Sequence, residues 1–244
     1  MDVEKRVSII KDWIVDYVNS MPKKASTLVV GVSGGIDSAV VSTISSMTDI
    51  KTIVLSMPIR QIKSQDDLSK LHCNWLENKF KNTTYLNINL DEVFTNFENA
   101  LGSNNNEHAF ANSRARLRMT TLYQVAGSNN GIVVGTGNKV EDFGVGFYTK
   151  YGDGGVDISP IADCTKTQVW DMGKFLKIDQ KIIDAPPTDG LWTDGRNDED
   201  QLGMSYQDLE EAMINPDSKN FEKYKKIREN NLHKMKEIPV CKFN

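Results

Sequence analysis

The stretch that decides the fold runs from residue 27 to residue 38 and reads Thr-Leu-Val-Val-Gly-Val-Ser-Gly-Gly-Ile-Asp-Ser. Residues 27–32 form a short apolar run without alternation, which is typical of a strand buried on both faces of a parallel sheet. Gly34 and Gly35 break the run, and from Asp37 onward the apolar residues have helical spacing. The sequence therefore predicts a glycine loop between a buried strand and a helix.

This glycine loop has the chemistry of an anion site. Glycines let the backbone turn tightly and approach a ligand closely, while the first amides of the following helix are unpaired and favour an anion. Ser33 and Ser38 add hydroxyl donors, whereas the carboxylate of Asp37 repels phosphate unless a Mg²⁺ ion lies between them. The simpler alternative is a strand-turn-helix corner with Asp37 as the N-capping residue. Neither a Gly-Lys-Ser/Thr ending nor a GxGxxG string is present.

Strand and helix patterns alternate along the rest of the chain. Ser64 is expected to cap its helix, and the glycine-rich or charged segments 138–155 and 186–200 are expected to be disordered loops that become ordered on ligand binding. The pattern predicts one doubly wound α/β domain over residues 1–244, with a mostly parallel sheet flanked by helices. Further strands are expected at 50–57, 85–90 and 131–135, and helices at 1–21, 64–79, 91–101, 109–126, 166–176, 206–214 and 218–236.

Composition narrows the class of protein. The formal net charge of the 244 residues is −4, so a broadly basic surface is absent and general nucleic-acid binding is disfavoured. No run approaches the roughly 20 apolar residues of a membrane span, and the charged N-terminus lacks the pattern of a signal peptide. Cys73, Cys164 and Cys241 are far apart and form no CxxC pair, which favours a reduced, cytoplasmic compartment.

Two later segments carry further candidate site residues. Arg114 and Arg118 share one face of their predicted helix, whereas Arg116 points to the opposite side, so one set can face a site while the other is solvated. Glu141 follows a predicted strand at the edge where open α/β sheets bind ligands, and is a candidate second oxygen ligand for Mg²⁺. The glycine-rich segment 146–157 supplies Lys150 as a charge and Asp153 and Asp157 as acceptors or a base.

The string SGGIDS at 33–38 resembles the signature of the N-type ATP pyrophosphatases, which transfer the adenylyl group of ATP to an acceptor oxygen. Within that superfamily the chain resembles the NAD synthetases over nearly its whole length. The motifs that carry this resemblance are SGGIDS, the arginine helix, VVGTGNKVE at 133–141, FYTKYGDGGVDISPI at 147–161, Lys166, Pro187-Thr188, Asp198-Glu199-x-x-Leu202-Gly203 and His233-Lys234.

The resemblance implies an activity and assigns roles. NAD synthetases amidate deamido-NAD to NAD with ammonia, through an adenylated nicotinate intermediate that releases pyrophosphate and then AMP. Asp153, Asp157 and Lys166 are the catalytic candidates, with Asp153 slightly preferred over Asp157 for handling ammonium, and Asp37 and Glu141 would hold Mg²⁺. Binding of ATP is assigned to Gly31, Val32, Ser33, Gly34, Gly35, Ile36, Asp37, Ser38, Thr136, Lys166 and Thr188. Binding of deamido-NAD is assigned to Arg116, Lys150, Asp157, His233 and Lys234.

The nitrogen source and the assembly are also expectations from this resemblance. About 26 residues precede the first strand, enough for one helix but not for a glutamine-hydrolysing domain, so free ammonia or ammonia from a partner is expected. The family implies a homodimer. Two alternatives stay open: another adenylating member of the superfamily, and an ATP-binding regulatory protein without turnover.

Overall fold

The computed structural model describes residues 1–188 and 197–243. Four parallel strands form its sheet in the order β3-β2-β1-β4, with bounds β1 Thr27–Gly31, β2 Lys51–Ser56, β3 Thr83–Asn87 and β4 Gly131–Val134. Val29 of β1 pairs with Ile53 on one side and Val133 on the other. The predicted parallel sheet and the doubly wound α/β class are confirmed.

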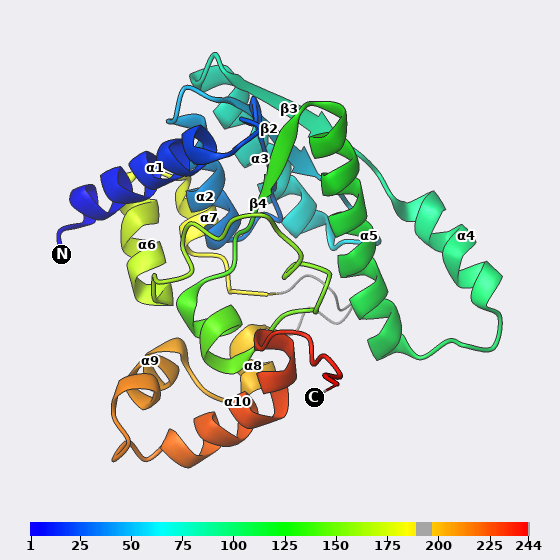
Figure 1. Ribbon diagram of the computed structural model, residues 1–244, viewed down its shortest axis with the longest axis vertical. Coiled ribbons are helices and arrows are strands. Elements are labelled where there is room, and N and C mark those ends of the chain that lie inside the picture. Colours follow the sequence, from blue (N-terminus) through cyan, green and yellow to red (C-terminus); the bar gives the residue numbers. More distant parts are fainter. Residues whose placement is uncertain (189–196, 244) are drawn as a thin grey trace.

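Helices cover both faces of this sheet (Figure 1). One apolar cluster joins a sheet face to α1 (Val3–Ser20), α2 (Ile36–Ser46), α3 (Lys63–Lys79) and α6 (Lys166–Phe175). A second joins the other face to α4 (Asp91–Leu101) and α5 (Glu107–Ser128). Because both faces are buried, the apolar runs of β1 and β2 need no alternation.

A third apolar cluster lies beyond the carboxyl ends of the strands (Figure 1). It joins a π-helix, η1 (Lys139–Val145), to α8 (Asp198–Leu202), α9 (Tyr206–Ile214) and α10 (Phe221–Met235), and the four-residue α7 (Gln180–Ile183) follows α6 in the chain. Tyr206 and Leu209 are fully buried there. The C-terminal helices therefore cover the carboxyl-end edge of the sheet, where the predicted site residues lie.

Several local predictions were wrong. Ile62, not Ser64, precedes the first turn of α3, and it makes no side-chain cap. β3 lies two to three residues before the expected strand at 85–90, because it ends with its partner β2 at the pair Ser56–Asn87. Residues 139–145 form the π-helix within the segment expected to be a loop. The expectation of disorder at 138–155 and 186–200 stays a prediction, and residues 189–196 of the second segment lie outside the described residues.

Candidate active site

The loop after β1 is held by its own serine hydroxyls. The Ser33 amide donates to Ser38 Oγ at 3.2 Å, the Gly35 amide donates to Ser33 Oγ at 3.3 Å, and Ser38 Oγ donates to the Gly35 carbonyl at 2.9 Å. Gly34 has φ +95°, and a Cβ there would lie 2.6 Å from the Gln65 carbonyl oxygen. The tight turn predicted for these glycines is therefore required by both backbone conformation and space.

The start of α2 is open to an anion. Its N-cap residue is Gly35, with no side-chain cap, so the interpretation of Asp37 as an N-capping residue is wrong. Asp37 instead accepts from Asn138 Nδ2 at 3.0 Å and from Lys166 Nζ at 2.5 Å. The first amides of α2 keep the unpaired donors and the favourable dipole that bind phosphate.

One cavity of about 240 Å³ brings most of the predicted ATP residues together. The loop after β1, the end of β4, the π-helix, α6 and the segment before α8 all contribute to its wall. Gly34 is the one predicted ATP residue that is not among the lining residues, and Glu141 and Asp153 line the same cavity. The predicted residues in the wall are Gly31, Val32, Ser33, Gly35, Ile36, Asp37, Ser38, Thr136, Glu141, Asp153, Lys166 and Thr188.

Lys166 links the two carboxylates predicted to hold a metal. Its Nζ lies 2.5 Å from Asp37 Oδ2 and 2.9 Å from Glu141 Oε1, and its side chain is 3% exposed. Burial alone would lower the pKa of Lys166, but the two carboxylates raise it above its usual value. The ammonium therefore stays charged at neutral pH and balances part of the negative charge of the two carboxylates beside the glycine loop.

The two carboxylates differ in their surroundings. Burial raises the pKa of Asp37, and Lys166 offsets this only in part because Glu141 lies close by. Burial also raises the pKa of Glu141, but the charge of Lys166 and the hydroxyl of Tyr206 outweigh it and hold that pKa below its usual value. Glu141 is therefore the firmer anion of the pair.

The donor set at this point fits Mg²⁺. In the described part of the chain no three His, Cys, Asp or Glu side chains converge on a common point, so the protein offers the two carboxylates of Asp37 and Glu141. Mg²⁺ in nucleotide enzymes is commonly held by one or two carboxylates together with substrate phosphates and water. Both carboxylates line the cavity together with the glycine loop, where the phosphates of a nucleotide would complete the coordination.

Two site residues were missed by the sequence analysis. Asn138 is fully buried, donates to Asp37 and accepts from the amides of Val140 and Glu141, so it links Asp37 to the π-helix that carries Glu141. Tyr206, also fully buried, donates its hydroxyl to Glu141 Oε1. Asn138 lies within the motif VVGTGNKVE, and Tyr206 follows the motif Asp198-Glu199-x-x-Leu202-Gly203. No local pattern, however, shows that Tyr206 contacts a residue 65 positions away in the chain.

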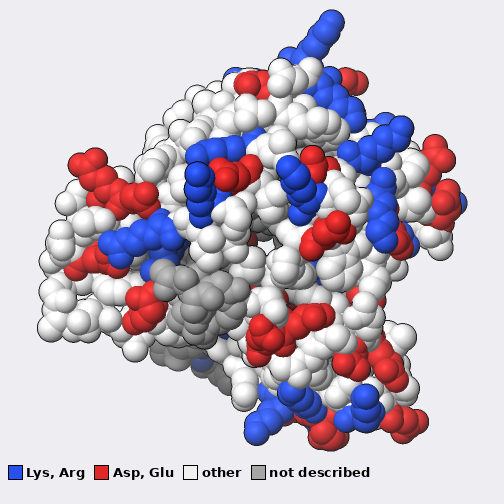
Figure 2. Space-filling view, turned by 180° about the vertical axis from the view of Figure 1, so that it is seen from behind, with Lys and Arg blue, Asp and Glu red and all other residues white. Residues whose placement is uncertain are grey.

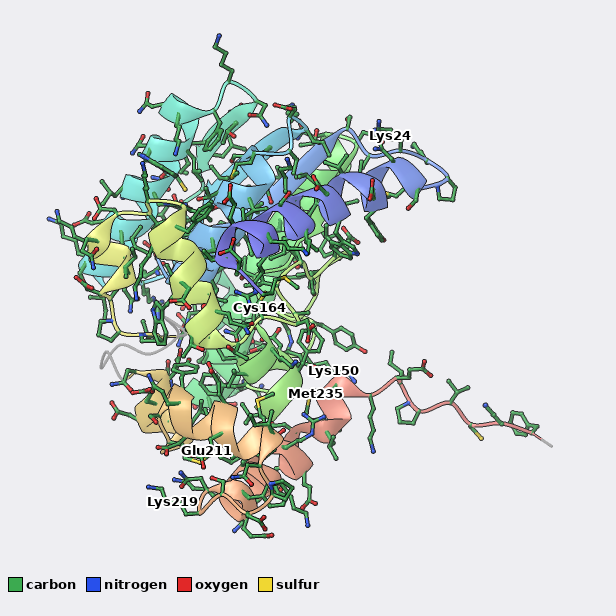
Figure 3. The ribbon with its side chains drawn as sticks, turned by 90° about the vertical axis from the view of Figure 1, so that its left-hand side faces the viewer. Lys24, Lys150, Cys164, Glu211, Lys219 and Met235 are labelled. Atoms are coloured by element: carbon green, nitrogen blue, oxygen red, sulfur yellow. The ribbon has the colours of Figure 1, made fainter. Side chains whose placement is uncertain are left out.

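The predicted deamido-NAD residues lie outside the cavity. Arg116 is exposed and donates to the Lys150 carbonyl at 3.3 Å, and Lys150 Nζ donates to the His233 carbonyl at 3.2 Å. Figure 3 shows Lys150 beside the last turn of α10, next to Met235. Lys234 Nζ donates to the carbonyls of Gly146 and Tyr148 at 2.8 and 2.9 Å. The division of the arginine helix is confirmed, because Arg116 is exposed while Arg114 is buried.

Asp153 and Asp157 have different environments. Asp157 accepts from the Val133 amide at 2.7 Å and from the Tyr123 hydroxyl at 3.1 Å, which ties it to the end of the sheet. Asp153 lines the main cavity, and its Oδ1 accepts from the Thr149 amide at 3.0 Å. It also lines a smaller adjoining cavity of about 120 Å³ together with Asp142.

The surface and the helices add two general facts. Positive and negative side chains are interspersed over the face shown in Figure 2. None of the helices that the structure describes combines the length and the apolar character needed to cross a membrane.

A family model described as NAD synthase matches residues 6–242 of this chain. This chain belongs to the NAD synthase family. Among similar proteins, an NH(3)-dependent NAD(+) synthetase from Carboxydothermus hydrogenoformans is 37% identical over 86% of this chain and 85% of its own length. One from Mesoplasma florum is 36% identical, covering 93% and 91%.

Solved structures of similar proteins support the NAD synthase fold. The structure titled NMN synthetase from Francisella tularensis matches with a TM-score of 0.90 and 29% identity, and the match covers 100% of both chains. An NH3-dependent NAD synthetase from Campylobacter jejuni matches with a TM-score of 0.79 and 25% identity, covering 99% of this chain and 100% of that one. The expected fold and family are therefore confirmed.

Proposed function

We propose that this protein is an ammonia-dependent NAD synthetase that converts deamido-NAD to NAD with ATP. The observation that carries the proposal is the single cavity in which the phosphate loop, Asp37, Glu141 and Lys166 meet, in a chain of the NAD synthase family. In this reaction a nicotinate carboxylate oxygen attacks the α-phosphorus of ATP and pyrophosphate leaves. Ammonia then attacks the carbonyl carbon, loses a proton, and displaces AMP together with the former carboxylate oxygen.

The residues of the cavity serve the first step. The amides at the start of α2 and the hydroxyls of Ser33 and Ser38 bind the pyrophosphate end of ATP, and Thr136 and Thr188 line the same cavity. Lys166 lines this cavity between the two carboxylates, and its charge offsets the negative charge that grows on the leaving pyrophosphate. Mg²⁺ held by Asp37 and Glu141 supplies further stabilisation of that charge when bound.

The second step needs a group that holds ammonium. We assign this to Asp153 rather than Asp157, because Asp153 lines the cavity and Asp157 does not. Arg116, Lys150, His233 and Lys234 lie outside the main cavity, Lys234 lining the smaller one, and are proposed to bind deamido-NAD. The family resemblance is the ground on which we propose a homodimer, and we place the enzyme in the cytoplasm.

The test is an assay with purified protein, ATP, Mg²⁺, deamido-NAD and ammonium chloride, in which NAD and AMP are measured. The proposal expects NAD and AMP in equal amounts. A preparation that forms no NAD, under conditions where a control synthetase works, would refute it. AMP release without deamido-NAD would point to another acceptor.

A second candidate is the amidation of nicotinate mononucleotide to NMN. The match to the Francisella tularensis NMN synthetase over the whole of both chains favours it. So does the use of Arg116, Lys150 and Lys234 as donors to backbone carbonyls, because a mononucleotide carries one phosphate and needs fewer cationic partners. Equal concentrations of both acids in one assay decide between them, since NAD and NMN are separated by chromatography.

A further inference from the structure

The motif Asp198-Glu199-x-x-Leu202-Gly203 has a structural role that the proposed function leaves unassigned. Its residues surround the beginning of α9. Glu199 Oε1 accepts from the Tyr206 amide at 2.9 Å, and Gly203 ends α8 with φ +66°, a conformation that favours glycine. Asp198 Oδ2 lies 3.3 Å from the Tyr206 hydroxyl. The motif therefore positions one side chain, Tyr206, from both its backbone and its hydroxyl end.

The aromatic ring of Tyr206 is also fixed by contacts. The side chain is fully buried and packs edge-on against Trp170 at a centroid distance of 5.8 Å. Lys166 Nζ lies 5.0 Å from the centroid of the same ring, within the range of a cation–π contact. Tyr206 thus contacts both members of the Lys166–Glu141 ion pair.

The Tyr206 hydroxyl and the Lys166 ammonium both donate to Glu141 Oε1. Two donors on one oxygen restrict rotation of the carboxylate, and neither of these two bonds uses Oε2. A carboxylate that is oriented in advance binds a metal better than a mobile one, which is why partners of ligating groups matter for affinity.

We propose that Tyr206 is a positioning residue of the metal site, whose hydroxyl holds the Glu141 carboxylate in the orientation that binds Mg²⁺ with ATP. The proposal rests on the proposed function in one respect, namely that Glu141 is a metal ligand. The proposal also explains the role of the Asp198-Glu199 motif. This motif and the start of α9 place the Tyr206 hydroxyl where it can donate to Glu141 of the π-helix.

Substitution Tyr206→Phe tests this with the smallest change, since it removes the hydroxyl and keeps the ring. Tyr224→Phe is the matched control, because Tyr224 is buried in the same apolar cluster and its hydroxyl makes no hydrogen bond with the described residues. The probe is Mn²⁺ in the presence of α,β-methylene ATP, with free Mn²⁺ followed by electron paramagnetic resonance, so no turnover is needed. Loss of a partner of a metal ligand typically weakens metal binding about 10–100-fold, and this is the expected loss for Tyr206→Phe.

A double-mutant cycle separates positioning from general packing. If the hydroxyl acts through Glu141, Tyr206→Phe weakens Mn²⁺ binding in the wild-type background but has almost no further effect in Glu141→Gln. A loss of the same factor in both backgrounds overturns the proposal, even if the variant is less stable. Mn²⁺ binding by Tyr206→Phe within about twofold of the wild type and of Tyr224→Phe also overturns it. Wild-type protein that binds no Mn²⁺ with the analogue refutes the metal assignment itself.

Discussion

Removal of the Lys166 ammonium is the perturbation whose consequence the structure defines most fully. Lys166→Met keeps the length of the side chain and deletes the charge that lies 2.5 Å from Asp37 and 2.9 Å from Glu141. The side chains of these residues are only 16% and 14% exposed, so water screens little of the repulsion that is left. Breaking a buried ion pair by removing one partner typically costs about 3–5 kcal/mol.

That cost predicts a measurable loss of folding stability. Each kcal/mol shifts the unfolding temperature of a chain of this size by about 2–4 °C, so a fall of roughly 6–20 °C is expected. The assays are thermal unfolding for the temperature and urea unfolding for the free energy, both at pH 7.5 with EDTA. They are repeated with Mg²⁺, which is expected to restore part of the loss by binding the two carboxylates. Lys174→Met, on the exposed side of the same helix, is the control and should change stability by less than about 0.5 kcal/mol. A Lys166→Met variant within about 1 kcal/mol of the wild type would refute the reasoning.

Three further predictions concern the site and the core. Asp37→Ala is expected to abolish AMP release, while Arg116→Ala mainly raises the KM for deamido-NAD, and equal loss of ATP affinity in both would contradict the division of the site. Gly34→Ala is expected to lower folding stability and ATP affinity, because the added Cβ would collide with the Gln65 backbone. Gly127→Ala is the control and should be neutral or stabilising, because there is open space around Gly127. Calorimetry compares the two variants. Burial lowers the pKa of His72 to about 4. The unfolded chain therefore binds a proton that the folded chain excludes, and about 3 kcal/mol of stability, fully present above about pH 6.5, is lost as the pH falls toward 4. His72→Gln should lose this acid dependence in urea titrations, and an unchanged slope would show that other groups cause it.

Elements with strong local patterns were predictable from the sequence. The bounds of α4 agree with the prediction because acidic residues begin the helix at Asp91 and Gly102 ends it with φ +57°. The tight glycine loop after β1 was predictable because the strand, the glycines and the following helix are contiguous. All residues of this loop except Gly34 line one cavity; their binding of ATP stays a prediction.

The π-helix and its contacts were beyond local reasoning. Three of the seven residues 139–145 are charged and one is glycine, yet distant side chains hold them in a helical turn. Asn231 of α10 donates to the Val145 carbonyl at 3.0 Å, and Arg228 donates to the carbonyls of Phe143 and Gly144 at 2.5 Å. These donors lie more than 80 residues away in the chain. Local periodicity therefore does not predict the π-helix or its hydrogen bonds.

The central claim is that the nicotinate carboxylate takes the adenylyl group of ATP, and isotope transfer tests it most directly. Deamido-NAD labelled with ¹⁸O in its carboxylate would be incubated with the protein, ATP, Mg²⁺ and ammonium, and the products analysed by mass spectrometry. Attack of the carboxylate on the α-phosphorus predicts one ¹⁸O in AMP and none in pyrophosphate. Unlabelled AMP formed together with NAD would contradict an adenylated intermediate at this site.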